Sequence, residues 1–277
     1  MPSSPLPWDP QFLRRSTLFA PLEPAATDLH NLADWPDRDF FNGMLASMTV
    51  TSGSGKPLRP VAPQSSAESS HPGYDAHCFL TGELETRERN WHDLFNALVW
   101  LTFPQSKAAL NARHYHAQQT SRGQNKRGAD RDALTLFDES GVIVVSTEAS
   151  LLTLLQTFSW KELFWHRRDD TLAAMRVFIF GHGLYEQALQ PFIGLTGKAI
   201  LLPVEESFID RPLNQQLAML DKEIAGLIHA GQLKHPRELS PLPILGVPGW
   251  IVDNENEDFY DNTNYFRPGR KTRDPIE

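Results

Sequence analysis

The chain has 277 residues, of which 40% are hydrophobic and 22% charged, and its formal net charge is −8. These values are typical of a globular protein with a substantial core, and the acidic balance makes nucleic acid an unlikely partner. No apolar run approaches the roughly 20 residues of a membrane-spanning helix, and the N-terminus lacks a signal-peptide pattern, so we expect a cytoplasmic protein with no membrane partner.

The N-terminal part divides into three segments. Residues 1–36 mix proline with aromatic side chains and are predicted to form an N-terminal arm. Residues 37–49 carry phenylalanine, leucine and methionine at helical spacing and predict a helix that docks on the body. Residues 51–73 are rich in serine, glycine and proline, which predicts a flexible insertion with an extended stretch at 58–61 and a mobile loop at 65–72.

A strand and two helices are expected next. Residues 74–80 are interpreted as a strand, on which the single cysteine, Cys78, is a small buried side chain rather than a nucleophile. Asn90 can cap a helix that ends near Phe103, with Asp93 three positions on as in a capping box. Pro104 breaks that helix and begins a second one, which runs to about residue 118.

The second half of the chain predicts a hairpin followed by alternating elements. Residues 133–137 and 142–146 alternate at period two around an Asp-Glu-Ser-Gly turn, which is typical of two antiparallel strands. The elements expected after this hairpin are a leucine-rich helix capped by Ser146 or Thr147, a short helix at 160–165, a strand at 176–180, a helix at 184–189, a strand at 199–204 and a helix at 212–228.

These elements indicate an α+β fold, with mixed helices packed on a small, partly antiparallel sheet. We expect a single globular domain over residues 37–270 and a disordered tail at 271–277. No element is obvious between the last helix, which Gly231 would end, and that tail.

Four residues are candidates for catalysis. His92 and Asp93 lie in the first turn of a predicted helix, where the helix dipole keeps a histidine neutral and favours bound anions. His182 stands between two glycines at a predicted junction of strand and helix, and Glu186 follows one helical turn later. The structural alternative is that Asp93 serves only the helix cap while His92 binds a neighbouring loop.

A second group of residues is predicted to bind a ligand. Asn96 shares a helix face with His92, and three polar side chains of the next helix form a stripe, although such a stripe is usually the solvated face. Basic residues from the following loop could close over the same anion. The predicted ligand-binding residues are Asn96, Lys107, Asn111, His114, Arg127 and Arg131.

A metal or cofactor site is not predicted. Asp132, Asp138 and Glu139 together with a histidine suggest Mg or Mn, but Asp138 and Glu139 are explained by the hairpin turn alone. The glycine motifs for phosphates and dinucleotides and the paired histidines of HExxH are missing, so the cofactor remains unknown.

Several runs of the sequence are similar to one family. They are NWHDLFN at 90–96, the Pro-x-x-Lys-x-x-Leu-Asn run at 104–111, RDALT and FDE within 131–139, Gly181-His182 with Glu186, and the Pro-Gly-Trp and aromatic runs between 248 and 268. Together they resemble, over residues 37–270, a bacterial family catalogued as a domain of unknown function, numbered 3025. The resemblance implies a proteobacterial cytoplasmic protein with one continuous domain, and it carries no activity.

The residues leave two functions open. In the first, the protein is a hydrolase-like enzyme whose pocket holds an anionic small molecule on Lys107, Arg127 and Arg131, while His92 and His182 move protons. In the second, it is a non-catalytic binding or scaffold protein whose polar residues form a structural network, with the helix around His92 covered by the tail at 259–270.

Overall fold

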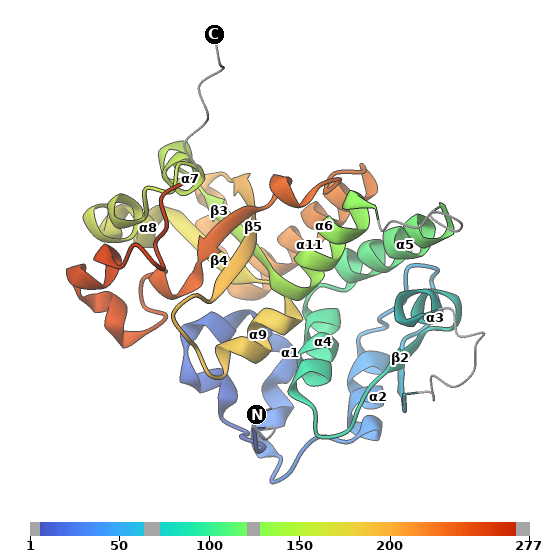
Figure 1. Ribbon diagram of the computed structural model, residues 1–277. Coiled ribbons are helices and arrows are strands. Elements are labelled where there is room, and N and C mark those ends of the chain that lie inside the picture. Colours follow the sequence, from blue (N-terminus) through green and yellow to red (C-terminus); the bar gives the residue numbers. More distant parts are fainter. Residues whose placement is uncertain (1–5, 64–72, 121–127, 270–277) are drawn as a thin grey trace.

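A computed structural model describes residues 6–63, 73–120 and 128–269 (Figure 1). Its main sheet has four strands in the order β4-β3-β5-β6, and a second sheet consists of the parallel pair β1-β2. Strand β3 is antiparallel to β4 and parallel to β5, and β5 is antiparallel to β6. The strands are β1 (Arg59–Val61), β2 (Glu83–Glu85), β3 (Gly141–Ser146), β4 (Met175–Ile179), β5 (Thr196–Pro203) and β6 (Ser240–Pro243).

Helices surround the main sheet. The α-helices are α1 (Glu23–Ala26), α2 (Arg38–Ser47), α3 (Tyr74–Thr81), α4 (Trp91–Thr102), α5 (Pro104–Thr120), α6 (Ala129–Ser140), α7 (Ala149–Gln156), α8 (Arg168–Ala174), α9 (His182–Ala188), α10 (Glu206–Ile209) and α11 (Leu213–His229). Short 3₁₀ or π turns are η1 (Phe12–Arg15), η2 (Thr17–Leu22), η3 (Thr27–Asn31), η4 (Glu162–His166), η5 (Pro236–Glu238), η6 (Ile244–Gly246), η7 (Val252–Glu255) and η8 (Glu257–Asp261). The α+β architecture with a small, partly antiparallel sheet is therefore confirmed.

Strand β3 lies at the centre of the core. All six of its residues are buried, because it has a strand on each side and contacts both α6 and α7. Helices α4 and α9 pack on each other, and α9 also packs on α6, so the ends of three helices meet beside the sheet (Figure 1). No helix in the ranges that the structure describes is both long and apolar enough to cross a membrane.

Helix signals in the sequence are confirmed for several elements. The Asn90 side chain accepts a hydrogen bond from the backbone N–H of Asp93 at 3.0 Å, which caps α4. Helix α5 begins at Pro104, whose missing N–H costs nothing at that position. Helices α2 and α11 lie where the spacing of apolar residues predicts them, and strand β1 lies in the predicted extended stretch.

The predicted hairpin is wrong. Residues 129–140 form α6, and the antiparallel partner of β3 is β4, more than thirty residues farther along the chain. The buried residues Ala133, Leu134 and Phe137 lie on one face of this helix, and two aspartates in its first turn suit the helix dipole. The alternation over five residues was too short to distinguish a strand from a helix.

The predicted strand at 74–80 is also a helix. Residues Tyr74–Thr81 form α3, and Cys78 is buried, as expected, but on a helix. Gly82 ends this helix with φ +77°, and its N–H donates to the carbonyl of Cys78. The cap predicted for α7 differs too: Glu148 holds that position, while the Ser146 hydroxyl accepts from the Glu148 N–H at 3.0 Å.

The two ends of the described chain add structure that the sequence did not reveal. Strand β6 forms an edge of the sheet and contains Pro241 and Pro243, which have no N–H to donate and so hide a strand pattern. Residues of the predicted arm, including Phe12 and Phe19, are 0% exposed within the hydrophobic core. The predicted loop at 65–72 and the tail at 271–277 lie outside the described residues.

Candidate functional site

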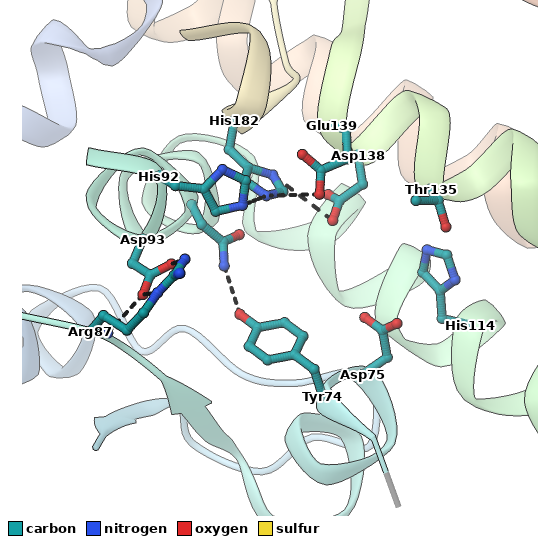
Figure 2. A pocket seen from close by; sticks show the side chains of 11 residues that line it. Tyr74, Asp75, Arg87, His92, Asp93, His114, Thr135, Asp138, Glu139 and His182 are labelled. Carbon is teal, nitrogen blue, oxygen red and sulfur yellow. Dashed lines mark hydrogen bonds and ion pairs between the residues drawn. The ribbon is translucent and has the colours of Figure 1, made fainter. Parts of the chain in front are cut away.

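A cavity of about 240 Å³ lies where α3, α4, α5, α6 and α9 converge (Figure 2). All of its lining residues have polar side chains, and they include three histidines and four carboxylates. The lining residues are Tyr74, Asp75, Arg87, His92, Asp93, Asn96, His114, Thr135, Asp138, Glu139 and His182.

Two histidines face each other at one end of this cavity. The Nε2 atoms of His92 and His182 lie 3.1 Å apart, and the two rings are nearly perpendicular. His92 belongs to the first turn of α4, and His182 is the first residue of α9. Gly181 and Gly183 allow this approach, because a Cβ at either position would lie about 2.5 Å from atoms of Glu139. The flanking glycines therefore have a packing role.

Carboxylates lie beside the outer nitrogen of each ring. His92 Nδ1 is 3.0 Å from Glu186 Oε2, and because a carboxylate only accepts, Nδ1 carries the hydrogen. His182 Nδ1 lies 4.0 Å from Asp138 Oδ2 and has no hydrogen-bond partner. The hydrogen bond to Glu186 raises the pKa of His92 above its ordinary value. The 3.1 Å contact is a hydrogen bond when one Nε2 carries a hydrogen; when each ring carries its only hydrogen on Nδ1, both Nε2 atoms present lone pairs, as metal ligands do.

Glu139 lies beside the two histidines and is the third possible metal ligand. Its Oε1 is 3.6 Å from His182 Nε2, and one ligand atom from each of His92, Glu139 and His182 can be chosen so that all three lie within 4.8 Å of one another. Burial raises the pKa of Glu139, and it lowers the pKa of His182 to about 3. His182 is thus neutral at physiological pH, as a metal-binding imidazole must be.

A buried ion pair supports the wall of the cavity behind Glu139. Lys107, only 4% exposed, donates to Asp138 Oδ1 at 2.5 Å and to Asn96 Oδ1 at 3.0 Å. Burial opposes ionisation of Asp138, but the charge and the hydrogen bond of Lys107, together with the nearby His182 and His114, outweigh it and lower the pKa to about 2. Asn96 in turn donates to the Tyr74 hydroxyl at 2.7 Å. These groups fix the end of α6 relative to α4 and α5.

The model of a protein family described as "Protein of unknown function (DUF3025)" matches residues 59–270, which is most of the chain. The chain belongs to this family. Comparison with curated proteins and with solved structures found no match. In this DUF3025 protein the geometry of the cavity is the feature that indicates a function.

Of the predicted catalytic residues, three meet in space. His92 contacts both His182 and Glu186, although about ninety residues of sequence separate it from these two. Asp93 also lines the cavity, but its carboxylate accepts hydrogen bonds from the backbone and the guanidinium of Arg87 at 2.7–2.9 Å. It therefore neutralises Arg87 and stabilises the segment before α4.

Only some of the predicted ligand-binding residues line the cavity. Asn96 and His114 line the cavity, whereas Lys107 lies behind it and is bound to Asp138. Asn111 serves the fold, since it donates to the carbonyl of Asp75 and accepts from the N–H of Gly53. The stripe on α5 is buried rather than solvated. Arg131 does not line the cavity, and Arg127 lies outside the described residues.

The tail does not cover the helix around His92, contrary to the second hypothesis. Within the described part of the tail, Tyr265 donates to the carbonyl of Leu195, and Phe266 packs beside Gly246. The aromatic face of α4 instead contacts the N-terminal segment, where the rings of Trp8 and Trp91 stack 5.3 Å apart. The polar face of α4 is left open to the cavity.

The contribution of α3 and α6 to the cavity is not predicted from the sequence. The sequence patterns predict a strand for Tyr74 and Asp75 and a turn for Asp138 and Glu139, so they place neither pair in the site. A helical interpretation of residues 129–140 would have placed Asp138 and Glu139 in its last turn, directly before the buried strand β3. Carboxylates at the end of a helix and directly before a buried strand are a signal in the sequence that could have identified them as site residues.

Proposed function

We propose that this cavity is a divalent-metal centre of a hydrolase-like enzyme, with His92, His182 and Glu139 as the protein ligands. The observation that carries the proposal is the convergence of two Nε2 atoms, 3.1 Å apart, with a carboxylate oxygen 3.6 Å from one of them. Nitrogens bound to one tetrahedral zinc at about 2.0–2.1 Å lie roughly 3.3 Å apart. The two imidazoles thus already have about the spacing of nitrogens that share one metal ion, with the Glu139 carboxylate beside them.

The surrounding residues support a catalytic site rather than a purely structural one. Two histidines and one glutamate leave coordination positions for water and substrate, and the same ligand set occurs in zinc hydrolases and in non-haem iron enzymes. Glu186 would orient His92 through its Nδ1–H, as outer carboxylates do in metal sites. A bound ion would lower the pKa of a coordinated water and polarise a carbonyl, which is why hydrolysis is the proposed reaction class.

An anionic small molecule is not part of the proposal. The basic side chains nearest the cavity already have carboxylate partners, Arg87 on Asp93 and Lys107 on Asp138. The remaining lining carboxylates would repel a phosphate or a second carboxylate. A neutral or cationic substrate is better supported by this distribution of charge.

The test is metal binding by the full chain. Protein equilibrated separately with zinc, manganese and ferrous iron, and then dialysed, is expected to retain one ion per chain, measured by elemental analysis. His182→Ala and Glu139→Gln should lose that ion, whereas His166→Ala, which removes an exposed histidine, should retain it. Retention that is equal in all variants, or no retention by the wild type, would overturn the proposal and favour a non-catalytic polar network.

A further inference from the structure

The far end of the same cavity contains acceptors without partners. In Figure 2, Asp75 and His114 lie away from the histidine pair, on α3 and α5. Among the residues that the structure describes, the Asp75 carboxylate accepts no hydrogen bond, and the His114 ring has none either. His114 is only 5% exposed, yet it lines the cavity. A buried polar ring that opens onto a cavity without a partner indicates a ligand group at this end.

The charges along the cavity differ between its two ends. Two carboxylates have basic partners, since Arg87 binds Asp93 and Lys107 binds Asp138. A divalent ion at the histidine pair would offset Glu139 and the nearby Glu186. Among the residues that the structure describes, Asp75 then remains as the lining carboxylate without a counter-charge, and it lies in the first turn of α3 rather than beside the metal ligands. A ligand complementary to this end is positively charged or rich in hydrogen-bond donors.

We infer that the cavity takes a compact cationic substrate, such as an alkyl ammonium or guanidinium compound, whose charged end lies at Asp75 and His114 and whose cleavable end lies at the metal. This inference rests on the proposed metal centre and adds the substrate class. The volume of about 240 Å³ limits the bound part to a small molecule or a single side chain. A lone pair on the His114 imidazole would accept the second hydrogen bond of the cation.

The experiment uses hydroxamates, which bind metals, as probes with tails of different charge. Zinc-loaded protein is titrated calorimetrically with alkyl hydroxamates that end in an ammonium, a methyl or a carboxylate group, in a series of increasing chain length. The ammonium probe of the best length is expected to bind about tenfold more tightly than its methyl analogue, since one partly buried ion pair contributes on that order. The carboxylate probe should bind most weakly.

Variants assign the preference to Asp75. Asp75→Asn should abolish the preference for the ammonium tail, and Asp75→Lys should invert it toward the carboxylate tail, a gain that misfolding cannot imitate. Asp253→Asn, which removes an exposed carboxylate that does not line the cavity, should leave the preference unchanged. Hydroxamates that bind equally whatever their tail, or a preference that survives in Asp75→Asn, would overturn the inference while the metal centre stands. Failure of every probe and of metal binding would remove the proposed function and this inference with it.

Discussion

At the scale of single residues, the orientation of two imidazoles determines the chemistry of the cavity. Glu186 keeps the hydrogen of His92 on Nδ1, and Asp138, itself held by Lys107, lies beside Nδ1 of His182. Both Nε2 atoms can then present lone pairs to the same point. The outer carboxylates are therefore as important to the proposed centre as its three ligands.

Glu186→Gln is expected to weaken metal binding without unfolding the protein. Glu186 is half-exposed and reaches the centre only through His92, so the fold does not depend on it. Loss of an outer carboxylate partner costs about 10–100-fold in metal affinity. The measurement is the metal dissociation constant by competition with a chelator. Glu162→Gln, an exposed glutamate outside the cavity, should behave like the wild type, and equal affinities in both variants would argue against the role of Glu186.

At the scale of elements, glycine is required at the end of α3. Gly82 has φ +77°, and a Cβ there would lie 2.3 Å from the carbonyl oxygen of Pro57. Gly82→Ala should therefore lower the free energy of unfolding by about 1–3 kcal/mol. The matched control is Gly226→Ala in the interior of α11, where a Cβ has open space, and it should add roughly 1 kcal/mol. Chemical denaturation measures both, and equal effects would contradict this account of α3.

The start of α5 depends on a buried carboxylate from α11. Asp221, 2% exposed, accepts from the backbone N–H groups of Gln105 and Ser106 at 3.0 and 2.7 Å. Burial raises its pKa above the ordinary value of 3.8, so the folded protein holds the proton more tightly than the unfolded chain. The contribution of Asp221 to the free energy of unfolding is therefore fully present below pH 3.8, and it is lost as the pH rises from that value through the raised pKa of the folded protein.

Asp221→Asn separates the hydrogen bonds from the charge. Asparagine places an NH₂ group, which cannot accept, against one of the two backbone N–H donors, whereas the protonated carboxyl keeps some accepting capacity on both oxygens. The variant should therefore be less stable than the wild type at pH values below the ordinary pKa of 3.8. Because asparagine does not ionise, this difference should shrink as the pH rises. The free energy of unfolding of both proteins, measured across that range, checks the slope. A difference that grows with pH would show that the hydrogen bonds from the two N–H donors lower the pKa of Asp221 by more than burial raises it.

At the scale of the whole molecule, the N-terminal segment contributes to the same core as the site. Phe19 is 0% exposed and stacks on Phe95 of α4 and Tyr185 of α9, the two helices that present His92 and His182. Loose packing at Phe19 would therefore be transmitted to both histidines. The division into an arm and a domain remains a prediction, but these contacts cross its proposed boundary.

Phe19→Ala should lower the free energy of unfolding by about 3–5 kcal/mol, because it leaves a cavity where the rings of Phe95 and Tyr185 now pack. Phe192→Ala, which truncates a ring that is 51% exposed, should change it by less than about 0.5 kcal/mol. Equilibrium denaturation compares the two. A cost as small for Phe19 as for Phe192 would show that the N-terminal segment is only loosely attached.

Local sequence signals are sufficient to predict the helices with strong caps and to single out the side chains with distinctive chemistry. Asn90 and Pro104 fixed the starts of α4 and α5, and a histidine between glycines and a histidine in a first helical turn were sufficient to suggest His182 and His92 as a site. Helix caps, proline and glycine act within a few residues, so their effects can be predicted without knowledge of the fold.

The surroundings of these histidines depend on how distant segments pack together. Over a short stretch, residues 129–140 fit both the strand period of two residues and the helical period of 3.6 residues. Packing on β3 and on Phe180 favours the helix, which brings Asp138 and Glu139 to the cavity. The same packing buries Lys107 against Asp138 and removes it as a binder of anions. Which carboxylates meet which bases depends on contacts between residues tens of positions apart, and no local pattern in the sequence encodes such contacts.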